Sequence, residues 1–410
     1  MKFELKKMVR NPIAIIAVIA VLFLNLYSLL FGSQSWDTFY CARESPFQTD
    51  IKRLQEDGAY FAGEINDEWT AKYSAEVDAL LRDPKNHVLE TEKEQIRKEY
   101  SEQEIAERPW LFSKEEFIFS HEYQKYEPMQ FSAHFYEFAE RFGNTHAENY
   151  RTQYPGKKGE VLAAKSEELH GFMANEYIAH HNYDWGWWKI RNVHSNLPFT
   201  VGLIMLIVLS PIFASEYSGK TDALLLTSKH GKNKLISAKL KSGFLFASVF
   251  WAVIEITNTF LIFALYGTTG AEAYWQNWML DNAPFPWNQL QITLVTIATS
   301  FLGVLFTAAL IMLISSLVKN QFTALIIGGV LLVLPMLSFA FSGSVLFQRI
   351  YNFFPSRVLS GILIWQKFDL TYLFGKAVHT QYIIITFAAI TVILGAFISY
   401  FRFKNHQVEN

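Results

Sequence analysis

Cysteine is nearly absent from this chain of 410 residues, which contains only Cys41. A single thiol has no partner within the chain, so an intramolecular disulfide is excluded whatever the redox state of the compartment. Any folded part of the protein must therefore be held together by an ordinary core.

Long apolar runs are missing between residues 33 and 196. This stretch holds 19 Lys and Arg residues against 30 Asp and Glu, whereas the remainder of the chain holds 17 against 8. Its Glu-, Lys- and Ala-rich segments between prolines predict helices, and its length suffices to bury a core. We therefore expect an α-helical soluble domain at 33–196. Aromatic residues near one helical stripe are interpreted as its core and not as a ligand site, namely Phe131, Phe135, Tyr136, Phe138 and Phe142.

The rest of the chain contains six apolar runs of the length needed to cross a hydrocarbon layer of about 30 Å. They cover residues 13–32, 197–214, 243–267, 290–317, 322–342 and 381–401. The first run is too long for a signal peptide and no cleavage site follows it, which favours a membrane anchor. The sequence predicts an all-α polytopic membrane protein with six transmembrane helices and one α-helical domain.

Lys and Arg are absent from the loop at 268–289 but frequent in 215–242. Because basic residues collect in cytoplasmic loops, the first loop is predicted outside the cell and the second inside. Counting spans from there places both termini in the cytoplasm, with 1–12 as an amphipathic helix and 402–410 as a tail, and makes the 33–196 domain extracytoplasmic. The protein is expected in a cell membrane of bacterial type.

The segment 343–380 departs from this charge pattern. It is predicted outside and yet carries Arg349, Arg357, Lys367 and Lys376. Its amphipathic pattern is typical of an interfacial or re-entrant helix whose long basic side chains reach the membrane surface.

Sequence signatures of catalysis are incomplete. Residues 214–221 (ASEYSGKT) match a permissive phosphate-loop pattern, but a membrane span precedes them where such a loop requires a strand. His121-Glu122 begins a zinc-protease pattern whose second histidine is replaced by Lys125, and Glu176 with His180 supplies only two ligands. We expect no catalytic residue, no metal site, no bound cofactor and no enzyme activity in this chain.

The basic segment 215–242 is predicted to form two short helical pieces. Ser218 or Thr221 can cap a first helix that contains the three leucines at 224–226, and Gly231 can end it before a second helix continues into the next span. Exposed leucines beside lysines fit two roles equally well. The first helix either docks on a cytoplasmic partner or lies on the membrane.

Residues in this segment resemble the cytoplasmic loop of the permease subunits of type-2 (ABC-2) ABC exporters. Glu216 is followed by Gly219 and Thr221, with Lys220 between them, in place of that family's Gly-Thr pair. Leu224 to Thr227 correspond to its Leu-Leu-x-x motif. A basic run leads from there to the next span.

The N-terminus resembles the same family, whose first helix often reads Glu-Leu-Lys-Lys ahead of Arg-Asn-Pro. This chain has Glu4 to Lys7 and then Arg10 to Pro12. Six spans with a long loop between the first two also fit the family. The acidic domain at 33–196 is not explained by the resemblance.

The resemblance implies a permease that pairs with a second, identical or homologous permease subunit and contacts membrane lipid. It also implies docking of two separate ABC ATPase subunits that hold the ATP and Mg, with no nucleic acid as partner. The segment 216–240 is then the coupling helix seated in an ATPase groove. The residues implied in coupling are Glu216, Gly219, Thr221, Leu224, Leu225, Leu226, Lys234 and Lys239.

One acidic residue, Glu255, lies near the middle of the third apolar run, with Asn258 and Thr259 one turn further on. A carboxyl at this depth costs about 2.5–3.5 kcal/mol on insertion scales, so it is expected to face protein or water. Two interpretations of this polar patch stay open. It is either a pathway or gating site, or a set of structural hydrogen bonds between spans.

Three functions are compatible with these patterns. The first is the transmembrane subunit of an ATP-driven exporter for an amphipathic peptide, an antimicrobial or a lipid-like compound, with the 33–196 domain helping to bind or release it. The second is a signalling subunit driven by the same kind of ATPase, whose outer domain senses or activates an extracytoplasmic partner without transport. The third, a hydrolase in the outer domain, would depend on His180.

Overall fold

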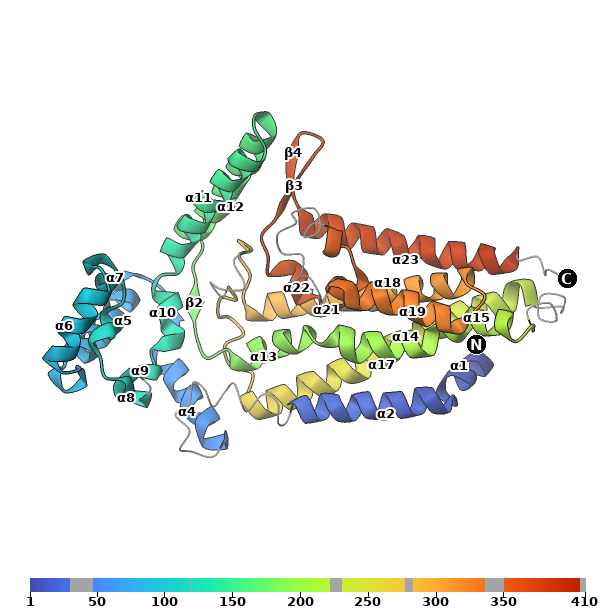
Figure 1. Ribbon diagram of the computed structural model, residues 1–410, viewed down its shortest axis with the longest axis horizontal. Helices are drawn as coiled ribbons and strands as arrows, with labels where there is room; N and C mark the ends of the chain where they lie inside the picture. The colour runs from blue at the N-terminus through green and yellow to red at the C-terminus, as the bar shows by residue number, and fades with distance from the viewer. Residues whose placement is uncertain (30–46, 119, 222–230, 277–282, 336–349, 406–410) are drawn as a thin grey trace. The chain divides into compact units, whose positions relative to one another are not determined.

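The computed structural model describes residues 1–29, 47–118, 120–221, 231–276, 283–335 and 350–405, and these are mostly helical (Figure 1). The chain forms two compact units. The first comprises Met1–Leu29, Gly186–Ala264 and Leu290–Asn410, and the second comprises Leu30–Trp185 and Leu265–Gln289. The mostly helical class predicted from the sequence is confirmed. Two small antiparallel sheets accompany the helices.

Helices of the first unit run roughly alongside one another (Figure 1). Its elements are α1 (Lys2–Val9), α2 (Pro12–Tyr27), α13 (Trp185–His194), the π-helical turn η4 (Pro198–Gly202), α14 (Leu203–Leu209), α15 (Pro211–Ser218), the π-helical turn η5 (Gly231–Leu235), α17 (Ile236–Tyr266), α18 (Gln289–Leu317), α19 (Gln321–Val333), α21 (Pro355–Ser360), α22 (Ile362–Trp365), β3 (Leu370–Leu373), β4 (Lys376–His379) and α23 (Thr380–Lys404).

Four helical runs among the described residues are long and apolar enough to cross a membrane. They are Trp185–Ser218, Asn233–Tyr266, Gln289–Leu317 and Thr380–Lys404. Each contains or overlaps one of the runs predicted at 197–214, 243–267, 290–317 and 381–401. The chain therefore has several transmembrane-like helices, as the sequence predicts.

The other two predicted spans run into residues 30–32 and 336–342, which lie outside the described residues, and are not confirmed. Over 13–32, the helix α2 ends at Tyr27, and α1 precedes it at an angle of 68° because the chain bends at Asn11 and Pro12. Over 322–342, α19 has only 13 residues, and positions from 336 onward lie outside the described residues. Six spans therefore stay a prediction, since the described residues hold four, or up to five if α1 and α2 form one bent span.

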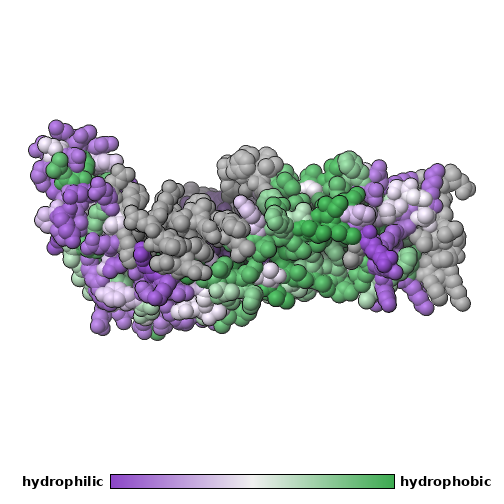
Figure 2. Space-filling view, turned by 90° about the horizontal axis from the view of Figure 1, so that it is seen from below, coloured by the Kyte–Doolittle hydropathy of each residue, from purple (hydrophilic) through white to green (hydrophobic). Residues whose placement is uncertain are grey.

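The surface of this bundle is apolar. Ile13, Ile16, Ile19 and Phe23 of α2 are all more than 60% exposed, and α17, α19 and α23 carry similar exposed residues. Figure 2, which shows the side of the bundle where α2 and α17 lie, has a broad apolar surface there, with hydrophilic residues gathered at the end of the bundle where α1 lies. In water such a surface would be strongly unfavourable, so it is suited to contact with lipid.

Inside the bundle, α14 and α15 lie among α2, α17, α18 and α19, and most of their apolar side chains are buried. A hydrophobic cluster joins them, with Met205, Leu209 and Phe213 at its centre and Ile254 and Met312 from α17 and α18 against them. The run Trp185–Ser218 is thus the central helical run of the first unit. Because α13 continues into it, the first stretch of the second unit ends at Trp185, whereas the domain is predicted to extend to 196.

The segment 343–380 was predicted as an interfacial or re-entrant amphipathic helix, and its first part, 343–349, lies outside the described residues. The remainder forms the short helices α21 and α22 and the hairpin β3–β4, which was not predicted. The helices are buried against α18. Gly303 of α18 permits this contact, because a Cβ at position 303 would lie only 2.4 Å from Leu359 Cα. Arg357 does not extend to a membrane surface as expected. Its guanidinium turns inward and donates to Leu363 O at 3.0 Å.

The second unit consists of shorter elements. They are α4 (Phe47–Tyr60), β1 (Gly63–Glu64), α5 (Asp67–Arg82), η2 (Pro84–Asn86), α6 (Glu90–Glu99), α7 (Glu102–Glu107), η3 (Pro109–Phe112), α8 (Glu115–Ile118), α9 (His121–Gln124), α10 (Glu127–Ala133), α11 (Phe135–Gln153), α12 (Lys157–Asn175) and β2 (His180–His181). The helices α11 and α12 form an antiparallel hairpin (Figure 1). Gly143 allows this close pairing, since a Cβ there would lie 2.7 Å from His170 Cβ.

A buried hydrogen-bond network lies in the core of the second unit, beside Trp69 and Phe135. Ser132 Oγ lies 2.7 Å from His181 Nδ1 and 2.9 Å from the Tyr274 hydroxyl. His181 is 7% exposed and its ring also contacts Trp69. Burial lowers the pKa of His181 from 6.5 to about 4, because the charged imidazolium is poorly solvated there.

This burial predicts acid sensitivity of the second unit. Well above pH 6.5 His181 is neutral in both the folded and the unfolded chain, so it contributes no pH dependence there. As the pH falls from 6.5 to about 4, His181 takes up a proton in the unfolded chain but stays unprotonated in the folded chain. We expect stability to fall by about 3 kcal/mol over that range and then to level off. The measurement is hydrogen exchange of the Ile65 amide, which donates to Ala179 O at 2.8 Å, corrected for the intrinsic pH dependence of exchange.

The variant His181→Gln should remove this fall, whereas His134→Gln, at an exposed histidine, should keep it. An equal acid response in the two variants would contradict the assignment to His181.

Candidate functional site

A break in the central helical run is bridged by a side chain from α18. Pro211 lacks the backbone N–H that a helix needs at that position, so α14 ends at Leu209 and α15 begins at Pro211. The N–H groups of Phe213 and Ala214 donate to Ser315 Oγ at 3.0 Å each, and Ser315 Oγ donates to Ser210 O at 2.6 Å. One hydroxyl therefore satisfies three backbone groups at the break and ties α15 to α18.

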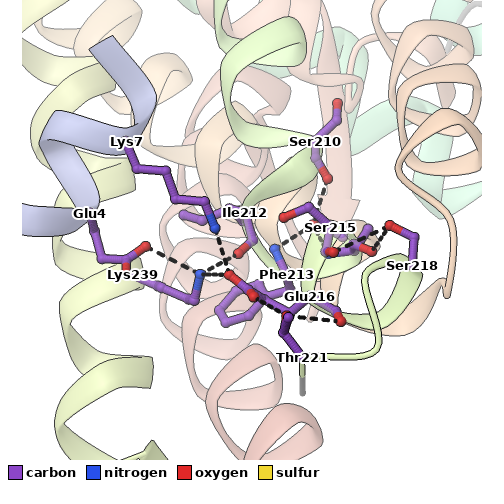
Figure 3. Close-up of polar contacts among 12 residues, drawn as sticks. Glu4, Lys7, Ser210, Ile212, Phe213, Ser215, Glu216, Ser218, Thr221 and Lys239 are labelled. Carbon is purple, nitrogen blue, oxygen red and sulfur yellow. Dashed lines mark hydrogen bonds and ion pairs between the residues drawn. The ribbon is translucent and has the colours of Figure 1, made fainter. Parts of the chain in front are cut away.

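At the other end of α15, Glu216 joins a buried cluster of charges (Figure 3). The Lys239 ammonium, from α17, lies 2.9 Å from Glu216 Oε1 and 3.2 Å from Glu4 Oε2, and donates to Ile212 O at 2.9 Å. The Lys7 ammonium lies 2.8 Å from the same Glu216 oxygen. Three helices, α1, α15 and α17, thus meet at two carboxylates and two ammonium groups.

Burial makes this cluster unusual. The side chain of Lys239 is 1% exposed, Glu216 8% and Glu4 6%, while Lys7 is about half exposed at the rim. Charges removed from water are tolerated only when they are paired and their remaining hydrogen-bond capacity is used. Both conditions hold for Lys239, whose three ammonium protons have three acceptors. The cluster is neutral overall, and losing one partner would leave an uncompensated buried charge.

The residues after α15 continue the cluster. Thr221 Oγ1 donates to Glu216 Oε2 at 2.6 Å, so both oxygens of Glu216 are engaged. Gly219 ends α15, and Lys220 adopts a left-handed backbone conformation with φ of 53°. Residues 214–221, which resemble a phosphate loop in sequence, therefore lie at the end of a helix, whereas a true phosphate loop follows a strand. The Thr221 hydroxyl in this stretch bonds to the Glu216 carboxylate.

The structure brings together only part of the predicted coupling set. Glu216, Thr221 and Lys239 meet in the cluster, Gly219 lies beside it as the end of α15, and Lys234 is exposed in η5. Leu224, Leu225 and Leu226 lie outside the described residues.

Sequence reasoning did not place Glu4 and Lys7 in this site, although both belong to the N-terminal motif. An acidic residue within the strongly basic segment 1–12 was the available signal. This signal does not indicate which residue Glu4 contacts, because Glu4 and Lys239 are 235 positions apart in the sequence.

The polar patch predicted on α17 divides between two neighbouring helices. Glu255 Oε1 lies 3.2 Å from His194 Nε2, at the end of α13, and accepts from Thr259 Oγ1 at 3.4 Å. Asn258 instead accepts from Asn25 Nδ2 of α2 at 2.7 Å. The contacts of Glu255 with His194 and of Asn258 with Asn25 join helices, whereas Thr259 bonds within α17, and both interpretations of the patch stay open. The sequence analysis missed His194 and Asn25, which lie at the edge of one apolar run and inside another.

The histidines singled out in the sequence do not form a ligand set. The helix α12 ends at Asn175, so Glu176 and His180 do not share a helix face, and His180 and His181 form the strand β2, which pairs with β1. Among the described residues no group of three or more His, Cys, Asp or Glu side chains is placed to hold a metal ion.

Comparison of the chain with models of protein families, with curated proteins and with solved structures finds no match. What can be said of the site therefore rests on its own geometry.

The bridge at Pro211 yields a test. Replacing Ser315 by Ala removes the acceptor of two buried N–H groups and the donor to Ser210 O, and should lower the free energy of unfolding by about 2 kcal/mol. Ser316→Ala is the matched control, because its hydroxyl donates to Leu313 O within its own helix, and about 0.5 kcal/mol or less is expected. Unfolding of the full chain in mixed micelles measures both variants. Equal losses would show that Ser315 does not stabilise the break.

Proposed function

We propose that this chain is the transmembrane permease subunit of an ATP-driven ABC exporter. A separate ATPase subunit holds ATP and Mg, and the chain couples ATP hydrolysis to the export of an amphipathic peptide, an antimicrobial or a lipid-like compound. It pairs with a second permease subunit, identical or homologous, in a cell membrane. Both termini and the segment 215–242 face the cytoplasm, and the second unit lies on the other side.

The observation that carries this proposal is the way in which α15 is held. It leads directly into the segment 222–230, which contains the three leucines of the proposed coupling helix. Glu216 ties its end to α17 and α1, and Ser315 ties its beginning to α18. A force applied to the segment would therefore reach three other helices through short polar contacts instead of being absorbed by one flexible loop.

Such a connection is what a two-state exporter needs. An ATPase that binds the coupling segment differently in its open and closed forms shifts the permease between inward and outward arrangements by that difference in binding free energy. The helix α15 is suited to transmit the shift because Ser315 ties it to α18 and the charge cluster ties it to α17 and α1. The buried ion pairs at its other end keep it joined to α1 and α17 while it moves.

The coupling segment can be tested directly. Replacing Leu224, Leu225 and Leu226 together by Ala removes the apolar anchors proposed to enter the ATPase groove. We expect the amount of ATPase that co-purifies with the chain to fall by more than about tenfold, since each buried leucine is worth roughly 1.5–3 kcal/mol. Stimulation of ATP hydrolysis should be lost with it. Both are measured on the full chain in lipid nanodiscs together with its ATPase.

Phe374→Ala is the control, because Phe374 is an apolar residue 96% exposed between β3 and β4 and should leave binding unchanged. If the triple variant still retains and stimulates the ATPase, the coupling role is wrong. Transport of a candidate compound into vesicles, measured in parallel, separates the exporter from a signalling subunit.

A further inference from the structure

The hairpin β3–β4 of the first unit ends in an exposed apolar tip. Its strands pair as far as Leu373 with Lys376, so Phe374 and Gly375 form a two-residue turn. Leu370 at the base of the hairpin is 1% exposed, whereas Leu373 is 41% and Phe374 96% exposed. The base is therefore part of the core, and the tip presents two large apolar side chains away from it.

The backbone of this turn makes phenylalanine an unusual residue there. Both turn residues have a positive φ, 49° at Phe374 and 85° at Gly375. Such a turn favours Asn or Asp followed by Gly, and a bulky residue with a positive φ is strained. An asparagine would suit the backbone better and would be well hydrated in water. The fold of the hairpin therefore gives no reason for an aromatic ring at this position.

Polar contacts fix the base of the hairpin to the start of α23. Thr380 N donates to Asp369 O at 3.1 Å, and the hydroxyl oxygens of Thr371 and Thr380 lie 2.9 Å apart. Gln381 Nε2 donates to Lys367 O at 2.6 Å. Figure 1 shows the hairpin pointing sideways from the start of α23, away from the other helices of the first unit, instead of continuing along the axis of α23. The tip is thus held beside the bundle, level with the first turn of α23.

The length of α23 puts this level at a membrane surface. Tyr382, which is 48% exposed, and Arg402 lie 20 positions apart in α23, which corresponds to about 30 Å, the thickness of the hydrocarbon layer. Phe387, Ile393 and Phe397 between them are all more than 40% exposed and suited to contact with lipid. Aromatic and basic residues at the two ends of a span are typical of the two bilayer surfaces. The hairpin therefore extends the lipid-facing surface of α23 sideways at the level of the headgroups.

We propose that the β3–β4 hairpin is an arm that lies on the membrane surface beside α23 and inserts Leu373 and Phe374 among the lipid headgroups. Aromatic side chains prefer this region of a bilayer. Lys376 is exposed beside them and suits the lipid phosphates, and the sequence has no acidic residue from 370 to 404 that would repel these phosphates.

The proposal rests on α23 crossing the membrane and not on ATPase coupling. The opposite end of α23 contacts α15, where the ring of Phe403 lies 5.4 Å from that of Tyr217. The arm is therefore remote from α15. Loss of Phe374 changes lipid contact and leaves ATPase binding intact, so that the arm and the coupling role can fail independently.

The test uses a fluorescent bimane label on the full chain in nanodiscs of phosphatidylcholine and phosphatidylglycerol. Cys41→Ser removes the single native thiol, and Ala377→Cys places the label next to the tip. Two quenchers are compared, a nitroxide carried on lipid headgroups and iodide in the water. We expect strong quenching by the lipid nitroxide and weak quenching by iodide. Quenching mainly by iodide would place the tip in water, and quenching by neither would show it covered by protein, such as a second copy of the chain. Either result would overturn the proposal.

Two further variants in the labelled chain identify the anchoring residue. Phe374→Asn should lower the ratio of lipid quenching to iodide quenching by about tenfold, because burial of a phenylalanine side chain changes an equilibrium by about that factor. Asparagine suits the turn, so this variant keeps the hairpin. Phe322→Asn is the matched control, since Phe322 is 65% exposed at the start of α19, and the ratio should stay unchanged. Equal ratios in the two variants would contradict the role of Phe374.

Discussion

The buried ammonium of Lys239 is the interaction on which the rest of the first unit depends. It joins Glu216 on α15 and Glu4 on α1, and its third proton is accepted by Ile212 O. A lone cation would be strongly destabilised in this position, and Glu4 would lose its counter-charge without Lys239, whereas Glu216 would keep only Lys7. Such a cluster contributes less to net stability than apolar packing would. It does require the three helices to meet in one arrangement, and it therefore specifies how the N-terminus packs on the bundle.

This constraint connects the fold to the proposed coupling role. The helix α15 is broken from α14 at Pro211, repaired by Ser315 of α18, and ended at the charge cluster. A short helix held at both ends by polar contacts moves with its neighbours as one body. The second unit has a different construction, with an aromatic core and a buried histidine.

Apolar run length and charge density predicted much of the fold, because helices in lipid and helices in water have different compositions. Four long apolar helices and the separate acidic part follow from these properties alone. The burial of helix α21 could not be predicted, since α21 packs against a glycine of α18, Gly303, far away in the sequence. For the site, Glu216 and Lys239 were named from a motif. Their pairing with Glu4, and the turn of Arg357 into the protein, are properties of tertiary packing and carry no local signal.

Lys239 and Glu216 should act as one unit that holds α15 to α17. A double-mutant cycle of Lys239→Met and Glu216→Gln measures this, with free energies of unfolding of the full chain determined in mixed micelles. We expect a coupling energy of about 1.5 kcal/mol or more for this pair, and additivity within about 0.5 kcal/mol when the exposed Lys241→Met replaces Lys239→Met. Additive effects at Lys239 itself would contradict it.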